Sequence, residues 1–379
     1  MKIILATPVY PPEIGGPATY TKGLALQLRD KHAITVVAYA STSELIEGIR
    51  LFVASKRRPL PIRLLKFFSI LWRESRGADV IYVQNAMAAG LPAVLVGRLR
   101  RIPVVLKFVG DEAWERASQT GKTKKRLEEF LAAPEGGWHT TLRMAIQGFV
   151  LRHADIVTAP SLYLRDALVR TYGVKNQRAF VNYNVAVIDA EAPFKATPVP
   201  HQIVTTARLT EWKGIDGTIR AVALLKEKYA DVRLVVCGDG PEMQNLKNLA
   251  RDKGVAERVT FLGNVSRAET WHQRKCSEVY VLNSTYEGLP HTALTSFAAE
   301  IPMVATNIPG TNEAVYDGQS GLLVPAGDDT ALANAIARLF DDAELRATVV
   351  AGATKILKEK FSWDAHIKTL LGFFQAARS

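Results

Sequence analysis

Short apolar runs alternate with helix-like stretches along the whole chain, and this alternation constrains the fold more than any other feature. Each run is rich in Val, Ile and Leu, and runs this apolar are typical of strands covered on both faces of a parallel sheet. In the first half the expected strands are 2–6, 33–39, 79–83, 103–108, 155–159 and 179–183. The expected helices between them include 18–30, 60–76, 138–153 and 161–172.

The alternation stops at residues 187–200, where Pro193, Pro198 and Pro200 predict a linker, and then it restarts. In the second half the expected strands are 202–207, 232–238, 258–263, 277–282, 302–306 and 321–325. The pattern predicts an α/β chain of two doubly wound Rossmann-like domains that face each other across a cleft. The predicted parts are a first domain 1–186, the linker, a second domain 201–362, and a helix 363–379 that packs back on the first domain in one reading.

Charge is distributed unevenly over the 379 residues. Residues 1–190 hold 27 Lys and Arg against 15 Asp and Glu, whereas residues 191–379 hold 21 against 22. The basic half predicts an anionic partner: a membrane surface, a nucleic acid or a phosphorylated substrate. The start, "MKIILATPVYPP", is expected to be a strand and not a signal peptide, and no apolar run approaches the roughly 20 residues of a membrane span. With only two cysteines, the composition favours a reducing, cytoplasmic setting.

Three strand–glycine–helix turns carry the residues that could bind an anion. Gly15 and Gly16 precede the first helix, Arg208 and Lys213 follow a strand of the second domain, and Glu287 opens the turn "EGLPH". The first amides of a helix bind anions, and two cations beside them could hold a diphosphate without a metal. A turn without a ligand and a solvated pair of cations remain the alternatives.

Several motifs in the second half resemble those of one enzyme family. The stretches "ARLTEWKGID", "VVCGDGPE", "VTFLGNV", "YVLNSTYEGLP" and "IPMVATNIPGTNEAVYDGQSGLLVPAGD" occur in this order. Together they resemble the nucleotide-sugar domain of retaining GT-B glycosyltransferases of glycosyltransferase family 4, and "PVYPPEIGGPATY" resembles the N-terminal glycine loop of that family. The resemblance covers nearly the whole chain and is looser over residues 40–150.

The resemblance implies roles for individual residues. Arg208 and Lys213 match the pair that neutralises the donor diphosphate, and Glu287 matches the acid that faces the transferred sugar. Asp111, in "KFVGDEAWERA", is the candidate for a polar residue near the acceptor; a helix N-cap is its alternative role. The remaining donor-binding positions that the resemblance implies are Gly15, Gly16, Gly263, Asn264, Val265, Gly288, Leu289, Pro290, His291 and Thr295.

Thr295 departs from the family pattern, which usually has a second glutamate eight residues after the first, in contact with ribose hydroxyls. Glu300 is no substitute, because five further residues turn it to another side of the helix. The departure leaves ribose recognition open, with simple packing of Thr295 in its helix as the alternative.

Charge development during the expected reaction suggests a mechanism. Cleavage of the bond between the anomeric carbon and the phosphate places negative charge on the leaving nucleoside diphosphate, where Arg208, Lys213 and the helix ends would stabilise it. No Asp-x-Asp motif occurs, so neither a catalytic metal nor another cofactor is expected.

A basic, apolar segment at 55–76 predicts membrane contact. A helix of this kind can lie on an anionic membrane, and many family members glycosylate lipid-linked acceptors. An ordinary domain helix with a basic outer face is the alternative. The cations expected to face the membrane are Lys56, Arg57, Arg58, Arg63 and Lys66.

The sequence therefore predicts a metal-independent retaining glycosyltransferase, with a hexose as the expected sugar. It would move the sugar from a UDP- or GDP-linked donor to a lipid-linked or saccharide acceptor at the cytoplasmic face of a membrane. A hydrolase or epimerase of the same fold and a non-catalytic nucleotide-sugar-binding subunit are the rivals. A nucleic-acid binder would explain the charge but not the motifs of the second domain.

Overall fold

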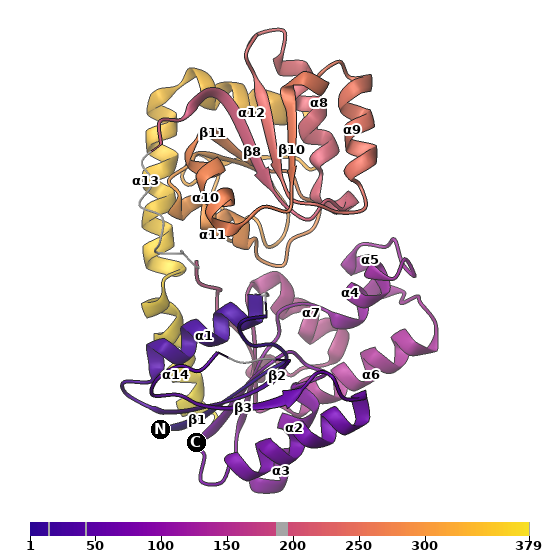
Figure 1. Ribbon diagram of the computed structural model, residues 1–379, viewed down its shortest axis with the longest axis vertical. Helices are drawn as coiled ribbons and strands as arrows, with labels where there is room; N and C mark the ends of the chain where they lie inside the picture. The colour runs from indigo at the N-terminus through magenta and orange to yellow at the C-terminus, as the bar shows by residue number, and fades with distance from the viewer. Residues whose placement is uncertain (14–15, 42–43, 187–195, 379) are drawn as a thin grey trace. The chain divides into compact units, whose positions relative to one another are not determined.

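The computed structural model describes residues 1–13, 16–41, 44–186 and 196–378. The chain divides into two compact units (Figure 1). Unit 1 consists of Met1–Tyr183 together with His366–Ser379, and unit 2 consists of Asn184–Ala365. Each unit has its own parallel sheet.

Unit 1 contains a seven-stranded sheet in the order β3-β2-β1-β4-β5-β6-β7. Every strand pair in it is parallel, so all the carboxyl ends lie at one edge and all the amino ends at the other. The strands are β1 (Lys2–Thr7), β2 (Ala33–Ala40), β3 (Arg50–Ser55), β4 (Val80–Gln84), β5 (Val104–Lys107), β6 (Ile156–Ala159) and β7 (Ala179–Val181). The helices are α1 (Gly16–Leu28), α2 (Leu60–Glu74), α3 (Gly90–Arg100), α4 (Glu112–Gln119), α5 (Leu127–Ala132), α6 (Trp138–His153), α7 (Leu162–Tyr172) and the short 3₁₀ turn η1 (Asn176–Arg178).

The last helix, α14 (Trp363–Ala376), belongs from His366 onward to unit 1 (Figure 1). It makes ring contacts with both the sheet and α1: Phe374 meets Tyr82 of β4 with ring centroids 5.6 Å apart, and His366 meets Tyr20 of α1 with ring centroids 5.4 Å apart. His366 Nε2 lies 2.6 Å from the Tyr20 hydroxyl of α1, and His366 Nδ1 lies 2.7 Å from the carbonyl oxygen of Tyr183. The C-terminal helix is thus part of the core of the first unit.

Lys107, at the end of β5, is buried in this same region of unit 1. Its side chain is 3% exposed, and its Nζ lies 4.2 Å from the centre of the Tyr20 ring. Among the described residues, Nζ has no hydrogen-bond partner. Burial lowers the pKa of Lys107 to about 7, and burial together with the Lys107 charge lowers the pKa of His366 to about 3.

Unit 2 contains a six-stranded parallel sheet in the order β10-β9-β8-β11-β12-β13. Its core is an aliphatic cluster that joins the sheet to α8 and α12, with Ile203, Ile219 and Ile336 fully buried. The strands are β8 (Val199–Thr206), β9 (Arg233–Cys237), β10 (Val259–Gly263), β11 (Ser277–Leu282), β12 (Met303–Thr306) and β13 (Leu322–Val324). The helical elements are η2 (Glu211–Lys213), α8 (Ile215–Leu225), α9 (Met243–Asp252), η3 (Ala256–Arg258), α10 (Arg267–Lys275), α11 (His291–Ala298), α12 (Asp329–Asp341) and α13 (Ala343–Lys360).

The predicted fold class, two doubly wound α/β domains, is confirmed, and every strand expected from the sequence is present. Two details differ. Strand β3 at Arg50–Ser55 was not predicted, although residues 51–54 form a short apolar run; a run of this length does not by itself distinguish a strand, and in the structure β3 is an edge strand whose residues are mostly half-exposed. Strand β8 begins at Val199, inside the predicted linker 187–200, of which residues 187–195 lie outside the described residues. Within the described part of the chain, no helix is both long and apolar enough to span a membrane.

Candidate active site

Five loops of unit 2 meet at the carboxyl edge of its sheet, where ligands of doubly wound sheets bind. The loops after β8 and β9 are fastened to each other: Leu209 N donates to Asp239 O at 2.9 Å, and Glu242 N donates to Leu209 O at 3.1 Å. Gly238 has φ +138°, and a Cβ there would collide with the carbonyl oxygen of Ala207. Glycine is therefore required for these two loops to approach this closely.

Lys213 and Glu287 form an ion pair at this edge. Lys213 Nζ lies 2.7 Å from Glu287 Oε1, and the two side chains are only 22% and 10% exposed. The Ser284 hydroxyl also donates to Glu287 Oε1, at 2.7 Å. Among the described residues both donors go to Oε1, which leaves Glu287 Oε2 able to accept a hydrogen bond from a ligand.

The backbone holds this pair in place. Thr285 N donates to Trp212 O at 2.8 Å, and Asn283 Nδ2 donates to Gly214 O at 2.9 Å. Gly214 has φ +62°, and a Cβ there would collide with the carbonyl oxygen of Asn283. The loop after β8 and the loop after β11 are thus joined on both sides of Lys213, by a backbone hydrogen bond at Trp212 and by the Asn283 side chain at Gly214.

Arg208 occupies a different environment from Lys213, although both follow β8. Its side chain is exposed. Its guanidinium makes no ion pair or hydrogen bond with any other described residue, so its donors are available to an anion.

The turn after Glu287 leads into α11, the third predicted anion-binding feature. Pro290 is the N-cap residue, and no side chain caps the helix. Ala293 N and Leu294 N both donate to the carbonyl oxygen of Pro290. The positive end of the α11 dipole lies at this turn and can stabilise a negatively charged group. Leu289 is buried beneath the turn, and His291 Nε2 lies 2.9 Å from Asn184 Nδ2.

Gly310, in the loop after β12, supports this turn and was not among the predicted site residues. It has φ +83°, and a Cβ there would collide with the carbonyl oxygens of Glu287 and Gly288. The sequence "IPGTNE" marks a turn at this position, but no pattern in it shows which backbone the glycine approaches.

Thr295 lies in α11 and uses its hydroxyl proton within the helix. Its Oγ1 donates to the carbonyl oxygen of His291 at 2.6 Å, the bond that threonine often makes to the preceding turn. The hydroxyl can then offer a ligand only its lone pairs. The base-edge candidates begin at Gly263, the last residue of β10, whose carbonyl oxygen accepts from Gly238 N at 2.8 Å; Asn264 is exposed and Val265 half-buried.

The candidates in unit 1 differ in how much of each the structure describes. Gly16 is the first residue of α1 and is exposed, with open space around the position of a Cβ. Gly15 lies outside the described residues.

Asp111 is the N-cap of α4, and this predicted alternative is confirmed. It is 1% exposed, and both of its carboxylate oxygens accept hydrogen bonds: Oδ1 from Trp114 N at 2.8 Å, and Oδ2 from Gln147 Nε2 at 2.9 Å and from the Tyr172 hydroxyl. Burial raises the pKa of Asp111, although the three donors act in the opposite direction. In this structure Asp111 is a buried acceptor that joins α4, α6 and α7.

Glu115, one turn into α4, is a carboxylate that the sequence did not single out. Its carboxyl group lies against Gly110, where a Cβ would collide with Oε1. Desolvation of its carboxyl group, together with the neighbouring Glu112 and Asp111 charges, raises the pKa of Glu115 to about 7. Glu112 is anchored differently, because its Oε1 accepts from the amides of Ala86 and Met87.

The basic segment of unit 1 contains α2, and its five cations are not equivalent: three of them precede the helix, and Arg63 and Lys66 lie within it. Lys56 is paired with Glu13, and Arg63 lies 5.8 Å from the centre of the Tyr39 ring. Arg57, Arg58 and Lys66 are exposed. The helix buries Phe67, Ile70 and Leu71, as the amphipathic pattern predicts.

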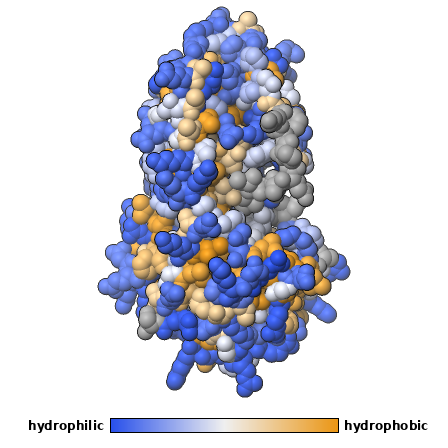
Figure 2. Space-filling view, turned by 90° about the vertical axis from the view of Figure 1, so that its left-hand side faces the viewer, coloured by the Kyte–Doolittle hydropathy of each residue, from blue (hydrophilic) through white to orange (hydrophobic). Residues whose placement is uncertain are grey.

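Large apolar side chains also remain exposed on α2: Leu60 is 54%, Ile62 53%, Leu65 71% and Trp72 39% exposed. On the face of unit 1 that Figure 2 shows, hydrophobic side chains likewise reach the surface among hydrophilic ones.

Known protein families match both halves of the chain. The family model described as "Glycosyl transferase 4-like domain" matches residues 15–184, and the model described as "Glycosyl transferases group 1" matches residues 191–356. Together the two models account for most of the chain.

An alpha-D-kanosaminyltransferase of Streptomyces kanamyceticus is 31% identical over 46% of this chain and 45% of its own length. The lipopolysaccharide core biosynthesis glycosyltransferase LpsD of Rhizobium meliloti is 33% identical over 50% of this chain and 52% of its own length. The chain thus spans about half the length of these curated relatives. The crystal structure of HepE from Anabaena in complex with UDP is similar with a TM-score of 0.75 at 20% identity, over 99% of this chain and 100% of that one. The chain belongs to the group 1 glycosyltransferases and has the two-domain GT-B fold.

Proposed function

We propose that this protein is a retaining glycosyltransferase that moves a sugar, with a hexose as the expected group, from a UDP- or GDP-linked donor to a lipid-linked or saccharide acceptor. Unit 2 would bind the donor and unit 1 the acceptor. The name of LpsD, which refers to lipopolysaccharide core biosynthesis, and the UDP bound to HepE support this proposal. The product would belong to a glycan, a glycolipid or a cell-envelope polysaccharide.

The observation that carries the proposal is the Lys213–Glu287 pair beside the uncapped start of α11. In the reaction, the bond between the anomeric carbon and the phosphate oxygen breaks, and its electrons remain on the departing nucleoside diphosphate. The acceptor oxygen forms the new bond to that carbon, and its proton passes to the departing diphosphate. The groups that hold the diphosphate must therefore bind it more tightly as its negative charge grows.

Three groups of unit 2 would provide this stabilisation without a metal. Lys213 is fixed by Glu287, Arg208 is exposed and without an ionic partner among the described residues, and the first amides of α11 carry a partial positive charge. Glu287 Oε2 would accept a hydrogen bond from a hydroxyl of the transferred sugar. Thr295 would offer the ribose only a weak neutral contact.

We further propose that the protein works as a peripheral protein at the cytoplasmic face of a membrane. The exposed cations Arg57, Arg58 and Lys66 of unit 1 would lie against anionic headgroups, and exposed apolar side chains such as Leu65 would insert at their level. This arrangement would bring a lipid-linked acceptor to unit 1.

A panel of UDP- and GDP-sugars against lipid-linked and saccharide acceptors, analysed by mass spectrometry, tests the function. A glycosylated acceptor whose linkage keeps the anomeric configuration of the donor is the expected product. Activity should survive a chelator; loss with chelator and recovery with magnesium would contradict the metal-free mechanism. Tight nucleotide binding without transfer to any acceptor would instead favour a non-catalytic subunit.

A further inference from the structure

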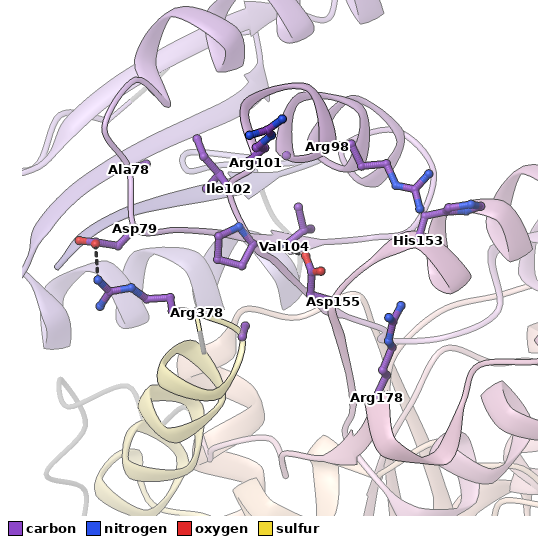
Figure 3. Close-up of a pocket in the computed structure, with 13 residues that line it drawn as sticks. Ala78, Asp79, Arg98, Arg101, Ile102, Val104, His153, Asp155, Arg178 and Arg378 are labelled. Atoms are coloured by element: carbon purple, nitrogen blue, oxygen red, sulfur yellow. Dashed lines mark hydrogen bonds and ion pairs between the residues drawn. The ribbon is translucent and has the colours of Figure 1, made fainter.

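Unit 1 contains a polar cavity that the proposed reaction does not use. It has a volume of about 550 Å³ and lies at the amino-terminal edge of the sheet (Figure 3). Asp79 and Asp155, which directly precede β4 and β6, line it together with Val104 at the start of β5. The site residues of unit 1, such as Asp111, follow the opposite, carboxyl ends of the strands.

Arginines from three separate parts of the chain reach this cavity (Figure 3). Arg98 and Arg101 come from the end of α3, Arg178 from η1, and Arg378 from the residues after α14. Arg378 Nη2 lies 2.8 Å from Asp79 Oδ1 and is therefore neutralised. Arg98, Arg101 and Arg178 are exposed, and none of them forms an ion pair with any described residue.

The two carboxylates of the cavity already have partners. Asp79 Oδ2 accepts from Lys2 N and Asp155 Oδ2 accepts from Val104 N, both at 2.8 Å, so each fixes the start of a strand. Four arginines thus face two carboxylates, and three of the guanidinium groups have donors to spare. The cavity therefore has an excess of positive charge.

Interaction with the dipole of α3 explains only part of this excess of positive charge. A cation in the last turn of a helix interacts favourably with the helix dipole, which accounts for Arg98. It does not account for Arg178, which lies in a single 3₁₀ turn, or for the backbone conformation of Arg101. Arg101 is the C-cap of α3 with φ +56°, a conformation in which glycine is strongly favoured over a residue with a Cβ. The chain keeps a guanidinium at a position where glycine would be less strained.

We propose that this cavity is a second anion-binding site, which takes a phosphate-bearing ligand through Arg98, Arg101 and Arg178. A planar guanidinium group can donate to two oxygens of one phosphate at the same time. The volume of the cavity lies in the range of small-molecule sites. The phosphate could belong to a soluble metabolite or to a lipid, because Leu99 beside Arg98 is 65% exposed and could contact an acyl chain. Both sources share the same chemistry in the cavity.

Isothermal titration of the full-length protein with pyrophosphate tests the site. The Arg208→Gln/Lys213→Met variant removes the proposed donor cations, and pyrophosphate should still bind it at one site. Adding Arg98→Gln, Arg101→Gln and Arg178→Gln should weaken that binding at least about tenfold, the equivalent of about 1.4 kcal/mol. The matched control adds Arg116→Gln, Arg143→Gln and Arg170→Gln instead, which makes the same charge change at exposed residues of unit 1 outside the cavity, and it should leave the affinity unchanged.

The Arg101→Gly variant separates loss of binding from loss of folding, because glycine readily adopts φ +56° and should not destabilise the protein. It should melt at the same or a higher temperature than the parent protein while binding pyrophosphate more weakly. Equal weakening in the cavity variant and its control, or no binding in the donor-site variant, would overturn the proposal. Failure of transfer in the donor-by-acceptor panel would leave it standing, since the cavity is assayed without the reaction.

Monomeric dihexanoyl phosphatidic acid, titrated in the same way, separates the two sources. Tighter binding than pyrophosphate, with the advantage lost in Leu99→Ser, would identify a lipid phosphate. Tighter binding of pyrophosphate would identify a soluble one. If substitution of the three arginines weakens the binding of neither probe, the proposed site is contradicted.

Discussion

Lys213 Nζ lies 2.7 Å from Glu287 Oε1, although the two residues are 74 positions apart in the chain. The pair connects the loop after β8 to the loop after β11, at the edge of the sheet where the donor is proposed to bind. Each residue therefore positions the other, and a substitution of either should disturb both proposed contacts with the donor.

Lys213→Met should lower kcat/KM by about 10²–10³-fold, because it removes a cation that stabilises the leaving diphosphate and leaves Glu287 without its partner. Glu287→Gln should lower it as well, and the double variant should lose less than the product of the two single effects, since the residues act as a unit. Steady-state kinetics of the four proteins measure this. Lys253→Met, an exposed lysine of unit 2, is the control and should behave as the parent. Fully multiplicative effects would show that the pair is not coupled.

Asp111→Asn should lower turnover and leave donor affinity nearly unchanged, because the donor contacts are proposed to lie in unit 2. The structure adds a cost in stability of about 1–3 kcal/mol, because the new NH2 group would face donors, either the Trp114 amide at one oxygen position or Gln147 and Tyr172 at the other. Urea unfolding and nucleotide titration measure the two effects. Tyr172→Phe, which removes a single donor, should destabilise less. Collapse of donor affinity with turnover preserved would contradict the assignment of Asp111 to the acceptor side.

The stability of the protein should rise as the pH increases from about 7 to about 10. The pKa of Lys107 is about 7 in the folded protein, against an ordinary value of 10.5, so between these values the unfolded chain binds more protons than the folded one. Lys107→Met should flatten this rise and raise the free energy of unfolding near pH 7 by about 2–5 kcal/mol. Urea midpoints across the pH range test this, with the exposed Lys31→Met as the control. A pH dependence that persists in Lys107→Met would assign it to other groups.

Thr295 should make the protein tolerant of donors whose nucleotide carries deoxyribose in place of ribose. Because its hydroxyl proton is donated to the carbonyl of His291, we expect kcat/KM for matched ribo- and deoxyribonucleotide donors to differ by less than about tenfold. Thr295→Glu should sharpen the preference for ribose, since a carboxylate accepts stronger hydrogen bonds, and Thr295→Val should change it little. A preference of about a hundredfold or more in the parent would show that another residue binds the ribose.

Charge reversal in α2 and in the turn before it should release the protein from anionic vesicles. Arg57→Glu, Arg58→Glu and Lys66→Glu change exposed side chains, and each charge near the surface contributes about 1 kcal/mol. Reversal of Lys247, Arg251 and Lys253 in unit 2 makes the same charge change and should have little effect. Co-sedimentation with vesicles that changes with neither lipid charge nor salt concentration would contradict binding to an anionic membrane surface.

The sequence by itself determined the fold class and the positions of nearly all the strands, because buried parallel strands are continuous apolar runs that local composition reveals. It also placed Arg208, Lys213 and Glu287 after strands, and hence at one edge of a sheet. Strand β3 was missed because its apolar run, residues 51–54, is too short to identify a strand by itself, and its residues at the sheet edge are mostly half-exposed.

Only the tertiary structure decided how these residues are used. Contacts between distant segments showed that Lys213 is held by Glu287, that Gly310 supports the turn before α11, and that Asp111 is enclosed by three donors. The same contacts left Arg98, Arg101 and Arg178 around one cavity and buried Lys107 beside Tyr20. The burial of a side chain and its ionic partners depend on which distant segments come into contact in the folded protein, and a single sequence does not show those contacts.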